Sequence, residues 1–219
     1  IPADIFSEEI GALKFNGKAE YLIAFDPLDG SLNYKIGKNI YPYGLLITVF
    51  KGKKPQLKDV ITSGAIEYTH DQAWIYEHGR TTNLNGQAIK LKNNWTNDKL
   101  TPIYVDLFSQ TAYQSYFPLV GQLAIRNIGS TIGSVFYVLE NIAAAIGGTN
   151  LRPEEIGAVT SLIKGAGGIV TDHQGKSLDN EFFSPDTTYE VLAGSKKTVN
   201  FAVANLKKDI NLDYQRCIC

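Results

Sequence analysis

The sequence predicts a layered α/β fold of the α+β kind, and two observations lead to it. Short apolar segments with strand-like composition fill most of the first hundred residues, and in the rest of the chain such segments alternate with helix-like ones. Alternating strands and amphipathic helices pack as layers of helices on sheets. We therefore expect one compact unit with two halves, residues 1–100 and 101–219.

Four strands are expected in the first half. The segment 21–26 is a short apolar run that ends at a Pro-Leu-Asp-Gly turn, and the β-rich segments 44–51, 60–68 and 73–77 follow it. The dipeptide Asn85-Gly86 after the last of them is a strong turn signal.

The second half mixes both kinds of element. Strands are expected at 103–107, 123–127, 169–171 and 191–193. A long helix is expected at 130–146, because apolar residues recur there at helical spacing until Gly147-Gly148 would stop it. Two further helices are expected at 153–165 and 196–208. The glycines after residue 164 read as a helix end and a tight turn, not as a dinucleotide-binding fingerprint.

The composition excludes several classes of protein. Lys and Arg number 21 against 22 Asp and Glu, so the chain lacks the basic excess of a nucleic-acid binder. No apolar run approaches the ~18 residues that cross a membrane, and no signal peptide opens the sequence. The only cysteines, Cys217 and Cys219, are too close for a disulfide framework, so a reducing, cytoplasmic setting is expected. A lipidated or metal-binding tail is the alternative reading of this pair.

The stretch from Asp26 to Ser31 carries the strongest chemical signal. An apolar strand delivers Asp26, Pro27 restricts the next φ angle, and Asp29 follows on a tight turn. A helical turn that begins at Gly30 would aim free N–H groups at the same place. Carboxylates beside anion-binding N–H groups suit a phosphate held against Mg²⁺. A plain surface turn is the alternative, and the upstream pair Glu8-Glu9 is either part of this site or a solvated face.

Other residues have simpler interpretations. His70, His78 and His173 share no zinc-ligand spacing and are expected in surface loops. The aromatic residues between 113 and 117 are expected to contribute packing rather than recognition.

Three motifs, in order, give a specific resemblance. Ser7-Glu8-Glu9, then Asp26-Pro-Leu-Asp-Gly-Ser31, then Arg126-Asn-Ile-Gly-Ser130 before a helix resemble the inositol monophosphatase and fructose-1,6-bisphosphatase superfamily. The segment from Glu154-Glu155 to Gly165-Ala-Gly-Gly168 is similar to the Ala-Gly-Gly ending of that superfamily. The resemblance spans roughly residues 6 to 195 and implies the αβαβα sandwich of the sugar phosphatases, with a metal site where both halves meet.

The resemblance also implies roles for residues of this chain. Metal ligands are implied at Glu8, Glu9, Asp26, Asp29 and Glu155, and at the carbonyl of Leu28. Phosphate and substrate contacts are implied at Leu28, Gly30, Ser31, Gly129, Ser130 and Thr131. Ser31 and Glu9 are the candidate catalytic residues, with Glu9 as the best remaining base.

The implied reaction is hydrolysis of a small phosphorylated metabolite by metal-activated water, with two or three Mg²⁺ ions, or Mn²⁺ in their place. An inositol-type polyol or sugar phosphate is the first candidate substrate. Fructose 1,6-bisphosphate and 3′-phosphoadenosine 5′-phosphate are alternatives, because Gly148 replaces an acid that binds inositol hydroxyls. A non-catalytic phosphometabolite-binding relative is the alternative of another class. A homodimer is compatible with all of these.

One feature of the superfamily is not found in this sequence. An Asp about twenty-three residues before the position of Glu8 helps to activate the water, and this sequence starts at Ile1. We expect that the 219 residues are not the whole working enzyme, and that an upstream segment or a partner covers one face of the first sheet.

Overall fold

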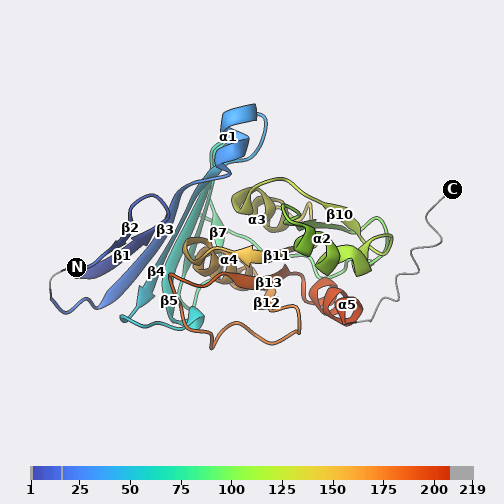
Figure 1. The fold of residues 1–219 in the computed structure, drawn as a ribbon. Coiled ribbons are helices and arrows are strands. Elements are labelled where there is room, and N and C mark those ends of the chain that lie inside the picture. Colours follow the sequence, from blue (N-terminus) through green and yellow to red (C-terminus); the bar gives the residue numbers. More distant parts are fainter. Residues whose placement is uncertain (1, 16, 208–219) are drawn as a thin grey trace.

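The computed structural model describes residues 2–15 and 17–207, which form four alternating layers of sheets and helices (Figure 1). An eight-stranded sheet is followed by the helices α3 (Thr131–Leu139) and α4 (Pro153–Gly165), then by a five-stranded sheet. The helices α2 (Gln110–Tyr116) and α5 (Lys196–Leu206) cover the far side of the second sheet. These layers are four of the five in the αβαβα sandwich expected from the sequence; the described residues include no helical layer on the outer face of the first sheet.

The first sheet has the strand order β2-β1-β3-β4-β5-β6-β7-β8. β1 runs parallel to β3, and the other pairs are antiparallel. The expected strands are confirmed as β3, β4, β5 and β6, whereas β1, β2, β7 and β8 were not predicted. The bounds are Ala3–Ser7 (β1), Gly11–Leu13 (β2), Tyr21–Asp29 (β3), Gly44–Lys51 (β4), Val60–Glu67 (β5), Gln72–Glu77 (β6), Asn83–Leu84 (β7) and Gln87–Ala88 (β8).

The second sheet has the order β10-β9-β11-β13-β12. Its strands are Pro102–Val105 (β9), Ala124–Arg126 (β10), Ala145–Leu151 (β11), Ile169–Thr171 (β12) and Tyr189–Gly194 (β13). The central strand β11 is parallel to β9 and antiparallel to β13. All strands except β11 fall where the sequence placed them.

The long helix expected at 130–146 is therefore wrong in its second part. α3 ends at Leu139, Asn141 takes a positive φ of 58°, and the chain continues as β11. Gly147 and Gly148 lie inside this strand and do not terminate a helix. Gly147 is required there because an added Cβ would lie 2.6 Å from the hydroxyl oxygen of Tyr116.

The remaining helices are short or terminal. α1 (Ser31–Gly37) projects beyond the end of β3 (Figure 1), and the single 3-10 turns are η1 (Leu57–Asp59) and η2 (Phe117–Leu119). α4 and α5 confirm the expected helices, although Lys208 lies outside the described residues, as do Cys217 and Cys219. Over residues 2–15 and 17–207, no helix has the length and apolar character of a membrane span.

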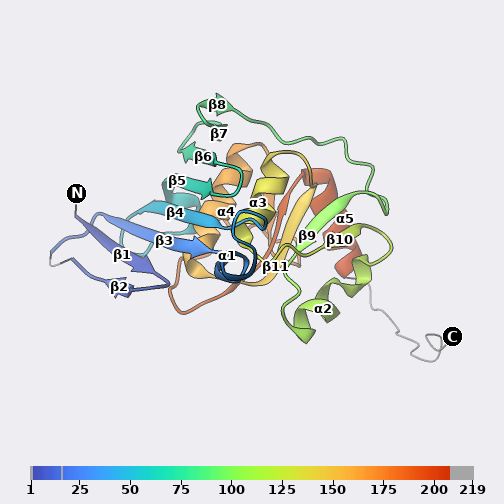
Figure 2. The same cartoon turned by 90° about the horizontal axis from the view of Figure 1, so that it is seen from above.

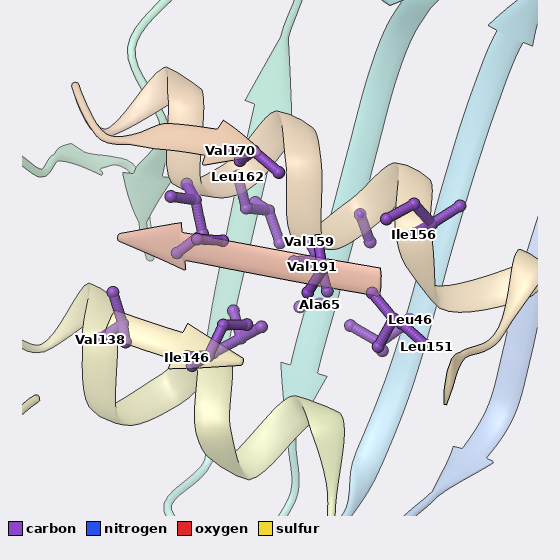
Figure 3. Packing of buried hydrophobic residues seen from close by; sticks show 14 of the residues in the cluster. Leu46, Ala65, Val138, Ile146, Leu151, Ile156, Val159, Leu162, Val170 and Val191 are labelled. Atoms are coloured by element: carbon purple, nitrogen blue, oxygen red, sulfur yellow. The ribbon is translucent and has the colours of Figure 1, made fainter. Parts of the chain in front are cut away.

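The core lies between the two sheets and is built around α4 (Figures 2 and 3). α4 packs on β3 to β6 of the first sheet and on β12 and β13 of the second. In Figure 3, Ile156, Val159 and Leu162 of α4 lie between the side chains of both sheets, and all three are fully buried. Ser31 and the residues after β3 lie at one end of this core.

Close approach of α4 to β4 depends on Gly157. A Cβ at this position would lie 2.6 Å from both Phe50 Cζ and Thr48 Cγ2. We expect Gly157→Ala to lower the free energy of unfolding by about 1–3 kcal/mol, because the added methyl group overpacks this contact. Denaturant unfolding measures the loss. Thr48→Ala removes one of the two obstacles, so adding it to Gly157→Ala should recover part of the stability. If the double variant is no more stable than Gly157→Ala, the contact with Thr48 is not the cause of the lost stability.

Candidate active site

Two parallel neighbouring strands bring the first acids to one edge of the sheet. Ser7, the last residue of β1, pairs with Phe25 of β3. The next residues along the two strands, Glu8 and Asp26, therefore leave the paired region side by side. This register explains how Ser-Glu-Glu, which is unremarkable on its own, is carried to the Asp-Pro-Leu-Asp turn.

A bulge in β3 then brings in the second aspartate. The pairing with β4 shifts between Asp26 and Asp29, and the carboxylate of Asp26 accepts a hydrogen bond from the Leu28 N–H at 2.9 Å. Asp29 is buried, and its two carboxylate oxygens accept hydrogen bonds from the N–H groups of Thr131 (3.2 Å) and Ile132 (2.6 Å). The start of α3 thus holds Asp29 in one orientation.

The third acid comes from the other half of the chain. Glu155 lies in the first turn of α4, and its carboxylate accepts the backbone N–H of Arg152 at 3.0 Å. Asp26, Asp29 and Glu155 are all buried, and each offers a carboxylate oxygen within 4.8 Å of the others. Among the residues that the structure describes, this is the one group of side chains whose ligand atoms could together hold a metal ion.

Burial and mutual repulsion disfavour the ionised forms of the three acids. Burial raises the pKa of Asp26 from 3.8 to about 6, helped by the charges of Asp29, Glu154 and Glu9. Burial also raises the pKa of Asp29, although the N–H groups of α3 oppose this. The pKa of Glu155 lies well above its ordinary value because the group is buried beside Asp29. A divalent cation would remove this penalty, and hard carboxylate oxygens suit Mg²⁺.

This arrangement predicts how stability depends on pH. Since the pKa of Asp26 is higher in the folded chain, about 6, than the ordinary 3.8, its stabilising contribution is present below about pH 4. That contribution, on the order of 3 kcal/mol, is lost as the pH rises through about 6. With chelator, the melting temperature should fall between pH 4.5 and 7. Added Mg²⁺ should raise it more at pH 7 than at pH 5, and equal increments at both pH values would contradict the prediction.

The three acids open onto a cavity of about 330 Å³ between the two halves. The substrate-contact positions expected from the sequence all line it, namely Leu28, Gly30, Ser31, Gly129, Ser130 and Thr131. Gly30 has a φ of 76°, and an added Cβ would lie 2.8 Å from the Cβ of Ser130. Glycine at this position therefore allows the loop after β3 to contact the start of α3.

The adjacent acids Glu8 and Glu9 differ in position. Glu8 lines the cavity and pairs with the guanidinium of Arg152. Glu9 is exposed on the turn after β1 and is not among the residues that line the cavity, although its charge reaches Asp26. Glu9 as a ligand or base remains a prediction from the sequence.

Several lining residues were not anticipated. Arg152 and Asp106 are charged, and Asn127 and Asn150 offer amide groups to the same cavity. Glu154 is buried near Asp26. The position of Arg152, directly before a predicted helix that begins with two acids, could have indicated that it lines the cavity. No local sequence feature indicated this for Asp106 and Asn150, which lie at or near the ends of strands of the second sheet.

The three histidines were predicted at the surface or in loops; two are exposed, and the third lies in a turn but is buried. His70 and His78 are exposed. His173 is only 8% exposed, and its Nε2 lies 2.9 Å from the hydroxyl of the buried Tyr116. Burial lowers the pKa of His173, which favours its neutral form. The loop after β12 folds back over α2, and nothing in the local sequence indicates that contact.

Comparisons with known proteins agree with this arrangement. The model of the inositol monophosphatase family matches residues 2–209. A protein of Thermococcus kodakarensis named "Fructose-1,6-bisphosphatase/inositol-1-monophosphatase" is 24% identical over 209 residues, 94% of this chain and 75% of the relative. "Bifunctional phosphatase IMPL2, chloroplastic" of Arabidopsis thaliana is 28% identical over 203 residues, 90% of this chain and 56% of the relative.

Solved structures show the same fold. Inositol monophosphatase from Anabaena has a TM-score of 0.79 at 21% identity, over 97% of this chain and 81% of that one. Extragenic suppressor protein suhB from Bartonella henselae has a TM-score of 0.80 at 19% identity, over 95% of this chain and 78% of that one.

Proposed function

Because the chain belongs to the inositol monophosphatase family, we propose that it hydrolyses a small polyol or sugar phosphate with Mg²⁺ as its cofactor. Membership makes the chain a metal-dependent phosphoric monoester hydrolase. The proposal concerns what membership leaves open, which is the substrate, the identity of the metal and the roles of individual residues. A cytoplasmic setting and a homodimer also remain predictions.

The observation that carries the proposal is the convergence of three buried carboxylates in the cavity that Ser31 lines. Asp26, Asp29 and Glu155 would hold the cation, with Glu8 and the Leu28 carbonyl at its edge. A divalent cation bound there supplies charge neutralisation for the phosphoryl group and lowers the pKa of water. The number of ions, two or three, follows only from the resemblance.

The residues of the chain have separate tasks in this proposal. The hydroxyl of Ser31 donates a hydrogen bond to a phosphoryl oxygen as negative charge develops on it. Asp29 is oriented by the N–H groups of α3, so the carboxylates are positioned before substrate arrives. The segment Gly129 to Thr131 forms the wall that orients the leaving group.

A bisphosphorylated sugar is the second candidate substrate. Gly148 lines the cavity at the position where the resemblance to the inositol branch implies an acid, and an added Cβ there would have nothing closer than 3.8 Å. The space is therefore open, and a ligand other than inositol can occupy it. The name of the Thermococcus relative, which includes both activities, supports the same two candidates.

A phosphate-release screen tests the proposal. The chain is incubated with Mg²⁺ and inositol 1-phosphate, fructose 1,6-bisphosphate or 3′-phosphoadenosine 5′-phosphate, and free phosphate is measured. We expect release from the first or the second substrate, and none with chelator. Release from the nucleotide alone would overturn the assignment of the substrate class. If the full-length product also releases no phosphate from any of the three substrates, the non-catalytic alternative is favoured.

A further inference from the structure

Arg152 lines the cavity of the three acids and pairs with Glu8, a proposed metal ligand. Its guanidinium pairs with the carboxylate of Glu8 and lies 3.8 Å from Glu154. Its backbone N–H holds Glu155, one of the three converging acids. Half of its side chain remains exposed, so the guanidinium can change partner without disturbing the core.

The charge of the cavity makes this arginine unusual. Within residues 2–15 and 17–207, the lining includes five carboxylates, those of Glu8, Asp26, Asp29, Asp106 and Glu155, and a single cation, Arg152. A phosphate dianion entering such a cavity is repelled unless cations balance the acids. Arg152 carries the one positive charge among the described lining residues, and a guanidinium matches phosphate oxygens with two parallel hydrogen bonds.

The helix itself gives no reason for an arginine here. Arg152 is the residue that caps the N-terminus of α4. Ser, Thr, Asp and Asn stabilise that position, and a cation is disfavoured there by the helix dipole. An exposed ion pair with Glu8 contributes little to stability. The position of the charge is better explained by the cavity than by the fold.

We propose that Arg152 serves two partners in turn. It pairs with Glu8 until that carboxylate turns to a divalent cation, and it then binds the phosphoryl oxygens of the substrate. The same arginine thus weakens cation binding at Glu8 and strengthens phosphate binding once the cation is present. This inference rests on the proposed function, because it takes Glu8 as a metal ligand and phosphate as the ligand of the cavity.

Calorimetry with Mn²⁺ tests the first half. Removing the competing cation should let Arg152→Gln bind Mn²⁺ about 3- to 10-fold more tightly than the wild type. In a Glu8→Gln background, the same substitution should change the affinity little, because the carboxylate for which the two cations compete is gone. Arg152→Lys, which keeps the charge, should behave like the wild type.

Inorganic phosphate, titrated at saturating Mn²⁺, tests the second half. We expect Arg152→Gln to weaken phosphate binding about 10-fold, and Arg152→Lys to recover part of it. The proposal requires both effects, so wild-type values for either ligand in Arg152→Gln would overturn it. If the wild type binds no divalent cation at all, the proposed function itself fails. The two failures are therefore distinguishable.

Discussion

Asp26→Asn is expected to abolish binding of Mg²⁺ or Mn²⁺ and to lower phosphate release by about 10³-fold. Asp26 is 2% exposed, and one of its carboxylate oxygens lies within 4.8 Å of carboxylate oxygens of Asp29 and Glu155. An amide keeps the shape of the side chain but removes the negative charge that a cation needs. Isothermal titration measures the binding, and phosphate release from the substrate found in the screen measures the activity.

Stability separates this effect from unfolding. Without divalent ions, Asp26→Asn should melt no lower than the wild type at pH 7, because the substitution removes a buried charge that repels Asp29 and Glu155. The exposed acid Asp186, which is not among the residues that line the cavity, provides the matched control: Asp186→Asn should keep full binding and activity. Equal binding heats for Asp26→Asn and the wild type would exclude Asp26 as a ligand.

The fold could be predicted where local pattern and burial agree. β3, β4, β5 and α4 have apolar periodicity, and Pro153 marks the start of α4. The end of β3 was predicted too early, because the strand continues as a bulge through the Pro-Leu-Asp segment to Asp29. β1 was not predicted, since its sequence Ala-Asp-Ile-Phe-Ser is short and gains its structure from pairing with β2 and β3. Such tertiary pairing leaves no local signal.

The segment from Ser130 to Leu151 shows why apolar runs are ambiguous. Residues 145 to 148, the first four of β11, are all buried, because β11 is the central strand of its sheet and is covered on both faces. A strand covered on both faces has no alternation, so its pattern continues the helical spacing of α3. α3 ends at Leu139, and Asn141 then takes a positive φ of 58°, a conformation that asparagine tolerates better than most residues.

The site residues could likewise be predicted where they belong to a local motif, and not where they depend on a contact between distant segments. Asp26, Asp29 and Glu155 were predicted because they belong to motifs with fixed spacing, and the structure brings them together. Arg152 was not, because its partner Glu8 is distant in sequence and the pair forms only when α4 meets the end of β1. His173 was taken for a surface residue because its contact with Tyr116 joins segments far apart in the chain.

Ser31→Ala is expected to reduce phosphate release by about 10²-fold while leaving metal binding intact. Ser31 is the first residue of α1, directly after the left-handed Gly30, and its exposed side chain faces the cavity that the three acids share. If its hydroxyl donates to the phosphoryl group, its removal takes away one hydrogen bond at the point where charge develops, and a single such donor contributes on the order of 10²-fold or more to the rate. Ser31→Thr retains the hydroxyl and should keep most of the activity, whereas both variants should melt like the wild type, because an exposed position contributes little to packing.

Steady-state phosphate release with saturating Mg²⁺ compares the three proteins, and titration with Mn²⁺ checks that the cation still binds. Unchanged turnover in Ser31→Ala would mean that the phosphate is held by other groups of the cavity, and an equal loss in Ser31→Thr would mean that the shape of the loop, and not the hydroxyl, controls the rate.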